Sequence, residues 1–423
     1  MKWEPKCWKN LPGGMNLSCI TRGELKLRRR QTPAFKTGSK APLSINPEQI
    51  PGACPERSRR IRPGEAEGLI SISSRFIDSN HYTRRERKMK QSKVIVSLWL
   101  LAIFVFVGPS IGKAADVLHM YTALDPNEAK VYIEAFIKDT KINVEWVRMS
   151  AGEVLTRLKA ESKNPQVSVW YGGPSVEFIA GRKEGLITPY KSPVGVPFLK
   201  GNLRDPEDYW MGFYFGAIGF GNNTNFFEKN KLAYPTSWQD LLKPEFKANI
   251  SIAYPYTSGT SFTTLATLVQ LMGEDKAFDY WKKLDSNIHH YNTSGSACVT
   301  QAGLGEIAIG IAFSHDILAK GTSKGYPIKG TFPSEGTGFE IGALALVKGG
   351  PEPELGKKFI DWSLSKRAQD LMQVWFRIPL NPQAEVAAGA TKASDVKLIN
   401  YDDEWAGNNN KRLIEKWRQI IGK

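Results

Sequence analysis

The sequence predicts an α/β fold with a largely parallel sheet, divided into two lobes, downstream of residue 115. Three observations support this prediction. Short apolar stretches alternate with amphipathic helical stretches in the order strand–helix–strand–helix. A second series of such elements follows an apolar, glycine-rich segment near the middle of the chain. The roughly 300 residues of this region are enough for two lobes of ordinary size.

Local signals place the elements of the first series. Asp125-Pro126 is expected to begin a helix, because proline is favoured at the first helical position, and apolar residues then recur at helical spacing over 129–137. Ser150 and Glu153 have the spacing of a capping box before another helix. In chain order, we expect strands at 117–122, 142–149 and 167–171, helices from 126 and over 154–162, and a turn at 172–175.

The second series begins with residues 210–222 (WMGFYFGAIGFGN), which are apolar, aromatic and rich in glycine. Such a segment is suited to a strand that crosses from one lobe to the other. In chain order, we then expect a short helix within 235–242, a strand at 249–253, helices up to 272 and over 276–284, and a buried strand at 306–313.

A secretory signal is expected well inside the chain. A short basic segment beginning at Met89 is followed by the apolar residues 94–107 and by small residues at Gly112 and Ala114. This apolar run is too short to span a bilayer, and small residues of this kind precede signal-peptide cleavage sites. We therefore expect a signal peptide over 89–114 and a periplasmic location. The alternative is a single membrane anchor that is not cleaved.

Residues 1–88 are expected to be a wrongly assigned, disordered upstream segment, because a signal peptide acts at an amino terminus. They hold 19 of the 57 Lys and Arg and 8 of the 42 Asp and Glu, and residues 89–114 add three lysines. The rest of the chain therefore has 35 basic and 34 acidic residues, so the net charge of +15 does not indicate nucleic-acid binding. The alternative is a basic, disordered arm that binds nucleic acid.

Six motifs follow one another beyond residue 115: SAGE, WYGGP, PTSWQDLL, YPYTSGTSF, GEIAIGI and IPLNP. Together they resemble the type II periplasmic solute-binding proteins of ABC importers, in the cluster of ferric-ion, thiamine, phosphonate and hexose-phosphate binders. The resemblance implies a monomer without a cofactor, whose two lobes are joined by crossing strands and close on one solute. It implies lobe 1 over 115–212, lobe 2 over 213–335, and a return to lobe 1 with C-terminal helices over 336–423.

The anion-binding residues are expected at the starts of helices. Ser150-Ala151-Gly152 and Ser258-Gly259-Thr260 each begin a helix, where backbone N–H groups, hydroxyls and the helix dipole favour a negative charge. Ser296 is expected to add a third turn of this kind. These residues suit a phosphate, a phosphonate or a carboxylate. The alternative for each turn is an ordinary helix cap.

A histidine and three acidic residues are expected to bind the rest of the solute. His315 and Asp316 resemble the pair with which hexose-phosphate binders of this cluster bind sugar hydroxyls, and an aspartate can accept from two hydroxyls. The alternative is that Asp316 caps a helix over 317–320. Glu335 and Glu340 are expected near the second crossing between the lobes. The alternative for Glu340 is a purely structural role as a hydrogen-bonded carboxylate of the hinge. The lobe 1 rim is completed by Thr122, Gly172 and Gly173.

A metal site is not expected. In the ferric branch, adjacent tyrosines supply anionic oxygens together with a His and a Glu, but here the matching residues are Phe313 to Asp316. Beyond residue 88 the sequence has one cysteine, Cys298, and no Cys/His cluster with zinc spacing. Ferric ion remains an alternative ligand. Thiamine is another, because aromatic residues that could enclose it are present, namely Trp170, Tyr171 and Tyr256.

Catalysis is not expected either. Residues 303–308 (GLGEIA) match the letters of a dinucleotide fingerprint, but they precede a strand instead of following one. Ser258 with His315 and Asp316 does not make a plausible relay, since sequence neighbours rarely place the base between the other two groups. A secreted hydrolase is the distant alternative. The sequence therefore predicts an extracytoplasmic protein that captures a small anionic solute, such as a phosphorylated sugar or phosphonate, and delivers it to an ABC permease.

Overall fold

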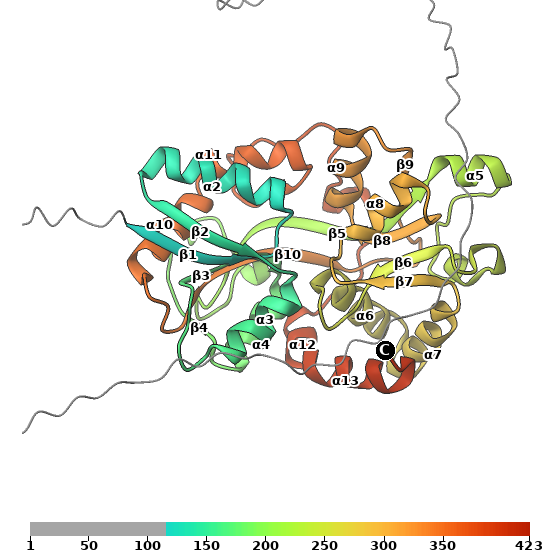
Figure 1. Cartoon of the computed structure of the whole chain (residues 1–423), viewed down its shortest axis with the longest axis horizontal. Coiled ribbons are helices and arrows are strands. Elements are labelled where there is room, and N and C mark those ends of the chain that lie inside the picture. The colour runs from blue at the N-terminus through green and yellow to red at the C-terminus, as the bar shows by residue number, and fades with distance from the viewer. Residues whose placement is uncertain (1–115) are drawn as a thin grey trace, which may run out of the picture. The chain divides into compact units, whose positions relative to one another are not determined.

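The computed structural model describes residues 116–423 (Figure 1). The expected signal peptide over 89–114 and the upstream residues 1–88 lie outside the described residues. Residues 116–423 form a two-lobed α/β fold, which confirms the predicted class. No helix within this range is long and apolar enough to cross a membrane.

The strands form one path, β2-β1-β3-β10-β5-β8-β6-β7, with three short strands beside it. The outer pairs of β1 with β2 and β3, and of β6 with β7 and β8, are parallel. The central pair of β5 and β10 is antiparallel, so the prediction of a largely parallel sheet was wrong there. The strands are β1 (Val117–Thr122), β2 (Asn143–Arg148), β3 (Val169–Pro174), β4 (Ile187–Thr188), β5 (Met211–Asn223), β6 (Ile250–Ala253), β7 (Ile288–Asn292), β8 (Ile309–Phe313), β9 (Ile328–Thr331), β10 (Phe339–Val347) and β11 (Ile378–Pro379).

The antiparallel centre follows from the path of the chain between the lobes. β5 pairs with β10 as far as Ala217 and with β8 and β9 from Ile218 onward, so it belongs to both sheets. β10 carries the chain back in the opposite direction. Every residue of β5 is buried, as its apolar composition predicts. The crossing lies between residues 217 and 218, later than the expected lobe boundary at residue 213.

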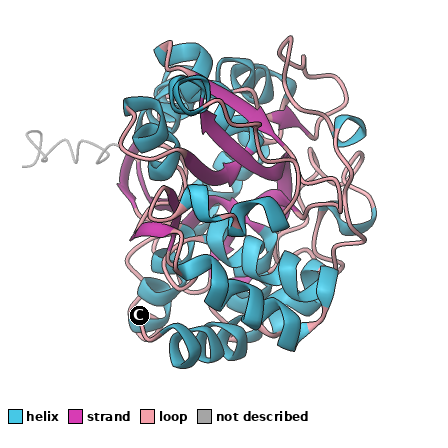
Figure 2. Ribbon diagram, turned by 90° about the vertical axis from the view of Figure 1, so that its right-hand side faces the viewer, coloured by secondary structure: helices cyan, strands magenta, loops and turns pink. Residues whose placement is uncertain are grey.

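Helices cover both faces of each sheet (Figures 1 and 2). In lobe 1, α2, α10 and α11 lie on one face and α3 and α4 on the other; in lobe 2, α8 and α9 lie opposite α6, α7 and α13 (Figure 1). The helices are α2 (Pro126–Thr140), α3 (Ala151–Ala160), α4 (Ser175–Lys183), α5 (Thr224–Asn230), α6 (Gly259–Met272), α7 (Glu274–Asp285), α8 (Ala297–Leu304), α9 (Ser314–Lys324), α10 (Pro353–Ser363), α11 (Lys366–Gln369), α12 (Asp403–Asn408) and α13 (Asn410–Ile421).

Two predicted helix starts form by local hydrogen bonds. Asp125 caps α2, because its Oδ1 accepts from the Asn127 amide at 3.0 Å. At α3, the Ser150 amide donates to Oε2 of Glu153 at 2.8 Å, as the capping-box spacing predicts. Both helices therefore begin at the sheet edge where β1 and β2 end. The short helix expected within 235–242 is a 3₁₀ turn, Gln239–Leu242.

The turn expected at 172–175 is not formed. Gly172 and Gly173 continue β3 with φ angles of 83° and 103°, and α4 begins at Ser175. Gly173 is required here, since a Cβ would lie 2.8 Å from Cβ of Ala151, which begins α3. Gly173 thus lets the end of β3 approach α3 closely, and Gly172 lets it approach Leu124.

The C-terminal helices, which the sequence placed in 336–423 without assigning them to a lobe, contact both lobes. α12 packs against α4 of lobe 1, whereas α13 packs against α6 and α7 of lobe 2. Trp417 on α13 is fully buried in the apolar core of lobe 2. On the surface, Arg412 and Lys416 both pair with Glu274 of α7, at 2.8 and 2.7 Å. The C terminus therefore connects the outer faces of both lobes.

Candidate functional site

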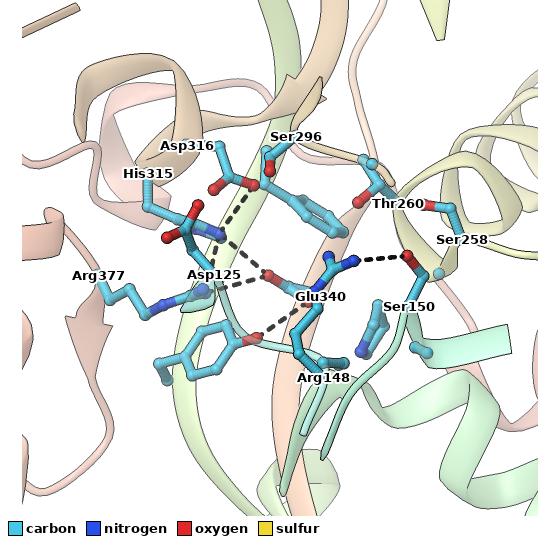
Figure 3. A pocket seen from close by; sticks show the side chains of 18 residues that line it. Asp125, Arg148, Ser150, Ser258, Thr260, Ser296, His315, Asp316, Glu340 and Arg377 are labelled. Atoms are coloured by element: carbon cyan, nitrogen blue, oxygen red, sulfur yellow. Dashed lines mark hydrogen bonds and ion pairs between the residues drawn. The ribbon is translucent and has the colours of Figure 1, made fainter. Parts of the chain in front are cut away.

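A polar pocket lies where the ends of the lobe 1 strands face the starts of α6, α8 and α9 in lobe 2 (Figure 3). Its empty volume, counted out into the open mouth, is about 440 Å³. Most of the residues expected in the cleft line it: Ser150, Ala151, Gly173, Ser258, Gly259, Thr260, Ser296, His315, Asp316 and Glu340.

Three of the other expected residues do not line the pocket. Thr122 is fully buried, and its hydroxyl accepts from the Leu124 amide at 3.3 Å, which orders the loop after β1. Gly172 lies against the Leu124 side chain. Gly152 contacts the backbone of lobe 2 and does not line the pocket. These residues shape the wall of the pocket.

The expected placement of Glu335 in the cleft is wrong. Its Oε1 accepts from the Ser237 hydroxyl at 2.5 Å and from the Trp238 amide at 3.1 Å. This carboxylate therefore holds the turn before a 3₁₀ helix of lobe 2. Glu335 lies in the loop before β10, near the crossing between the lobes, as the sequence suggested. The sequence did not identify Ser237 and Trp238 as its partners.

One end of the pocket is formed by the starts of α6 and α8. Ser258 and Thr260 are buried at the start of α6, where an α-helix leaves N–H groups without intrahelical acceptors. Gly295, just before α8, is in close contact with them, because a Cβ there would lie 2.7 Å from Oγ of Ser258. Ser296 lines the same end. Two helix starts with hydroxyls thus converge on one point, as an anion site requires.

Arg148 adds a positive charge to this end, and the sequence analysis missed it. Its guanidinium donates to Oγ of Ser294 at 3.0 Å. It also donates to Oγ of Ser150 at 3.4 Å (Figure 3). Arginine stays charged at neutral pH. A charged residue at the carboxyl end of a parallel strand, as Arg148 is in β2, was the signal that could have identified it.

The start of α3 does not have the free amides that were expected. The amides of Gly152 and Glu153 donate to the Thr257 carbonyl of lobe 2, at 3.0 and 3.3 Å. At this helix, two amides that were predicted to bind an anion therefore already have an acceptor. The Ser150 hydroxyl still faces the pocket (Figure 3).

The opposite end of the pocket contains a buried ion pair that the sequence did not reveal. Nε and Nη2 of Arg377 donate to the two carboxylate oxygens of Glu128 at 2.6 and 2.9 Å. Nη1 of Arg377 lies 2.8 Å from Nε2 of His315. Because arginine has no acceptor, we infer that Nε2 accepts and that Nδ1 carries the proton. Burial and Arg377 hold the pKa of His315 well below its usual value, so the ring is neutral.

Two more carboxyl groups lie beside His315. Oε1 of Glu340 is 3.4 Å from Nε2 of His315, and the Tyr214 hydroxyl donates to Glu340 Oε2 at 3.5 Å. Burial raises the pKa of Glu340 and, to a lesser degree, that of Asp316. The Glu340 side chain is 2% exposed and that of Asp316 18%, so Asp316 is the one that reaches the open pocket.

Asp316 is not the helix cap considered above. α9 begins at Ser314, and Asp316 lies within its first turn. Asp125, at the start of α2, also lines the pocket, and its Oδ2 is 3.5 Å from Nζ of Lys320 on α9. Acidic groups of both lobes thus face this end. Within residues 116–423, no three His, Cys, Asp or Glu residues are arranged to hold a metal ion.

Behind the pocket, Glu177 makes the stability of the protein depend on pH. Its Oε2 lies beside Gly259, the side chain is buried, and burial raises the pKa from an ordinary 4.5 to about 8. The folded state therefore binds a proton that the unfolded state releases between these values, so this contribution to stability falls as the pH rises from 4.5 to 8.

We expect Glu177→Gln to abolish this contribution. In urea unfolding at pH 5 to 8.5, the variant should gain stability relative to the wild type as the pH rises, by at most about 1.4 kcal/mol per pH unit. The difference between the two proteins cancels the titration of all other groups. A difference that is independent of pH would contradict the prediction.

Comparisons with known proteins agree with this architecture. Residues 175–404 match the family model described as bacterial extracellular solute-binding protein. An uncharacterized protein of Haemophilus influenzae is 35% identical over 79% of this chain and 99% of its own length. A putative 2-aminoethylphosphonate-binding periplasmic protein of Salmonella typhimurium is 27% identical over 64% of this chain and 80% of its own.

A solved structure is also similar to this chain. The periplasmic binding protein AfuA from Actinobacillus pleuropneumoniae, with exogenous fructose-6-phosphate bound, is 34% identical with a TM-score of 0.70. The match covers 73% of this chain and 99% of AfuA.

Proposed function

The chain belongs to the family of bacterial extracellular solute-binding proteins, and from this we propose that it captures a phosphorylated sugar between its lobes in the periplasm and delivers it to an ABC permease of the membrane. The expected signal peptide over 89–114 belongs to the same proposal, as does a monomeric state. The binding of fructose-6-phosphate by the similar AfuA supports this choice of solute class.

The observation that carries the proposal is the chemical difference between the two ends of the pocket (Figure 3). At one end, Arg148 and the starts of α6 and α8 supply N–H groups, hydroxyls and a positive charge. This combination binds a phosphate group. At the other end, the Asp316 carboxylate supplies acceptors for hydroxyl groups. A solute with a phosphate at one end and several hydroxyls at the other satisfies both.

A second candidate is an aminoalkylphosphonate, because Asp125 and Asp316 could accept from an ammonium group. Its phosphonate would occupy the same helix starts. Ferric ion fits the pocket poorly. Tyr214 is the tyrosine that lines it, and burial raises the pKa of its hydroxyl well above the usual value, which disfavours the phenolate that iron requires.

Thermal-shift measurements on a protein of residues 116–423 test the solute class. The panel is glucose-6-phosphate, fructose-6-phosphate, glucose, inorganic phosphate, 2-aminoethylphosphonate and ferric citrate. A ligand at 100 times its Kd adds about 2.7 kcal/mol of stability. The proposal expects the largest shift with a sugar phosphate and little with glucose. A shift with ferric citrate or 2-aminoethylphosphonate alone would overturn it.

Replacing Arg148 with methionine should weaken the binding of the sugar phosphate by about tenfold to a hundredfold, because a charge-assisted hydrogen bond is lost. Inorganic phosphate should weaken in parallel, since Arg148 lies at the phosphate end. Isothermal titration calorimetry gives both affinities. Arg157→Met is the matched control, because Arg157 is exposed on α3 and pairs with Glu161. Unchanged affinity for Arg148→Met would mean that Arg148 only supports Ser294.

A further inference from the structure

The start of α3 joins the two lobes by a direct backbone contact. α3 belongs to lobe 1, and its Gly152 and Glu153 amides donate to the carbonyl of Thr257 in the loop after β6 of lobe 2, at 3.0 and 3.3 Å. The positive end of the α3 dipole strengthens this interaction with a carbonyl oxygen. We call it the α3–Thr257 contact.

Glycine at position 152 is what allows the backbones to meet. A Cβ at Gly152 would lie 2.7 Å from the Tyr256 carbonyl oxygen and 3.0 Å from the Thr257 carbonyl. Both neighbours are backbone atoms, so no side-chain rotation can relieve the overlap. Any other residue at this position would therefore hold the lobes apart or distort one of them.

The other polar contacts across the pocket use long side chains. Arg148 of lobe 1 reaches Ser294 of lobe 2 at 3.0 Å, and Lys320 of lobe 2 lies 3.5 Å from Asp125 of lobe 1. Flexible side chains of this length tolerate several separations of the lobes. The α3–Thr257 contact requires one separation, because it is made by backbone atoms on both sides.

Thr257 is also connected to both anion-binding turns of lobe 2. Residues 258–260 follow it directly and begin α6. Its own hydroxyl donates to the Thr293 carbonyl at 3.0 Å, next to the turn that begins α8. A displacement of Thr257 therefore displaces the groups that would hold the phosphate.

We propose that the α3–Thr257 contact couples closure of the lobes to binding of the anion, with Gly152 as the residue that permits it. The proposal rests on the proposed function, because it takes the anion to bind at residues 258–260. When the α3 amides bind the Thr257 carbonyl, the start of α6 is held at the lobe interface. There, Arg148 of lobe 1 and residues 258–260 of lobe 2 can bind the same anion.

Gly152→Ala tests the proposal without weakening α3 itself, since alanine is favoured over glycine inside a helix. We expect the Kd for the best ligand of the wild type to rise at least about tenfold, with faster dissociation in stopped-flow fluorescence. Small-angle X-ray scattering of the saturated variant should give a larger radius of gyration than the saturated wild type. Gly321→Ala in α9 is the matched control, because its Cβ would have 3.6 Å to the nearest atom, on Ile328.

Wild-type affinity and normal compaction in Gly152→Ala would overturn the proposal, and so would equal losses in Gly321→Ala. The ligand panel on the wild type decides the proposed function separately. If the wild type binds another solute of the panel, comparing Gly152→Ala with the wild type in that solute still tests whether the α3–Thr257 contact couples closure to binding. Without any ligand, the variant should scatter as the more open molecule, and equal scattering of the two proteins would contradict the contact.

Discussion

Replacing Arg377 with methionine should lower the free energy of unfolding by about 3–5 kcal/mol, because it leaves the Glu128 carboxylate buried without its charged partner. Both side chains are less than 5% exposed, and the pair is bidentate. The stacked Tyr214 ring, 3.9 Å from Cζ of Arg377, loses a cation as well. Urea unfolding monitored by circular dichroism measures the loss.

Two variants control this prediction. The double variant Arg377→Met with Glu128→Gln should recover much of the stability, since no uncompensated charge is then buried. Arg367→Met breaks an exposed pair with Asp139 and should change stability by less than about 1 kcal/mol. A small effect of Arg377→Met alone would mean that Glu128 is neutralised in another way.

Asp316→Ala should weaken the binding of the sugar phosphate by about tenfold to a hundredfold, or about 1.5–3 kcal/mol, because hydroxyls of the solute lose a charged acceptor. Inorganic phosphate has no such hydroxyls, so its affinity should stay the same or increase. Calorimetry with both ligands separates the two ends of the pocket. Equal losses for both ligands would show that Asp316 supports the pocket and does not recognise the solute.

Glu335→Ala is the matched control for Asp316→Ala. The sequence placed both carboxylates in the cleft, but Glu335 holds the turn at Ser237 and Trp238 instead. We therefore expect Glu335→Ala to lower stability and to leave the affinity for the solute unchanged. A loss of affinity comparable with that of Asp316→Ala would contradict the placement of Glu335.

The features that the sequence predicted are those that depend on neighbours along the chain. The cap at Asp125, the start of α3 at Ser150 and the apolar strand β5 follow from hydrogen bonds and burial within a few residues. The turn at 258–260 belongs to this group, because the first amides of any helix lack acceptors within the helix. The order of motifs was sufficient for the family and therefore for the two lobes.

The tertiary structure alone decided which polar groups became partners. Arg377 precedes the IPLNP motif and reaches His315 and Glu128, far away along the chain, because β11 joins the lobe 1 sheet beside β5. The start of α3 was a free helix terminus by sequence, yet its amides bind Thr257 of the other lobe. A sequence shows the capacity of each group to donate or accept. The packing of distant segments determines the partner that satisfies it, and so separates the groups left for a solute from those already paired.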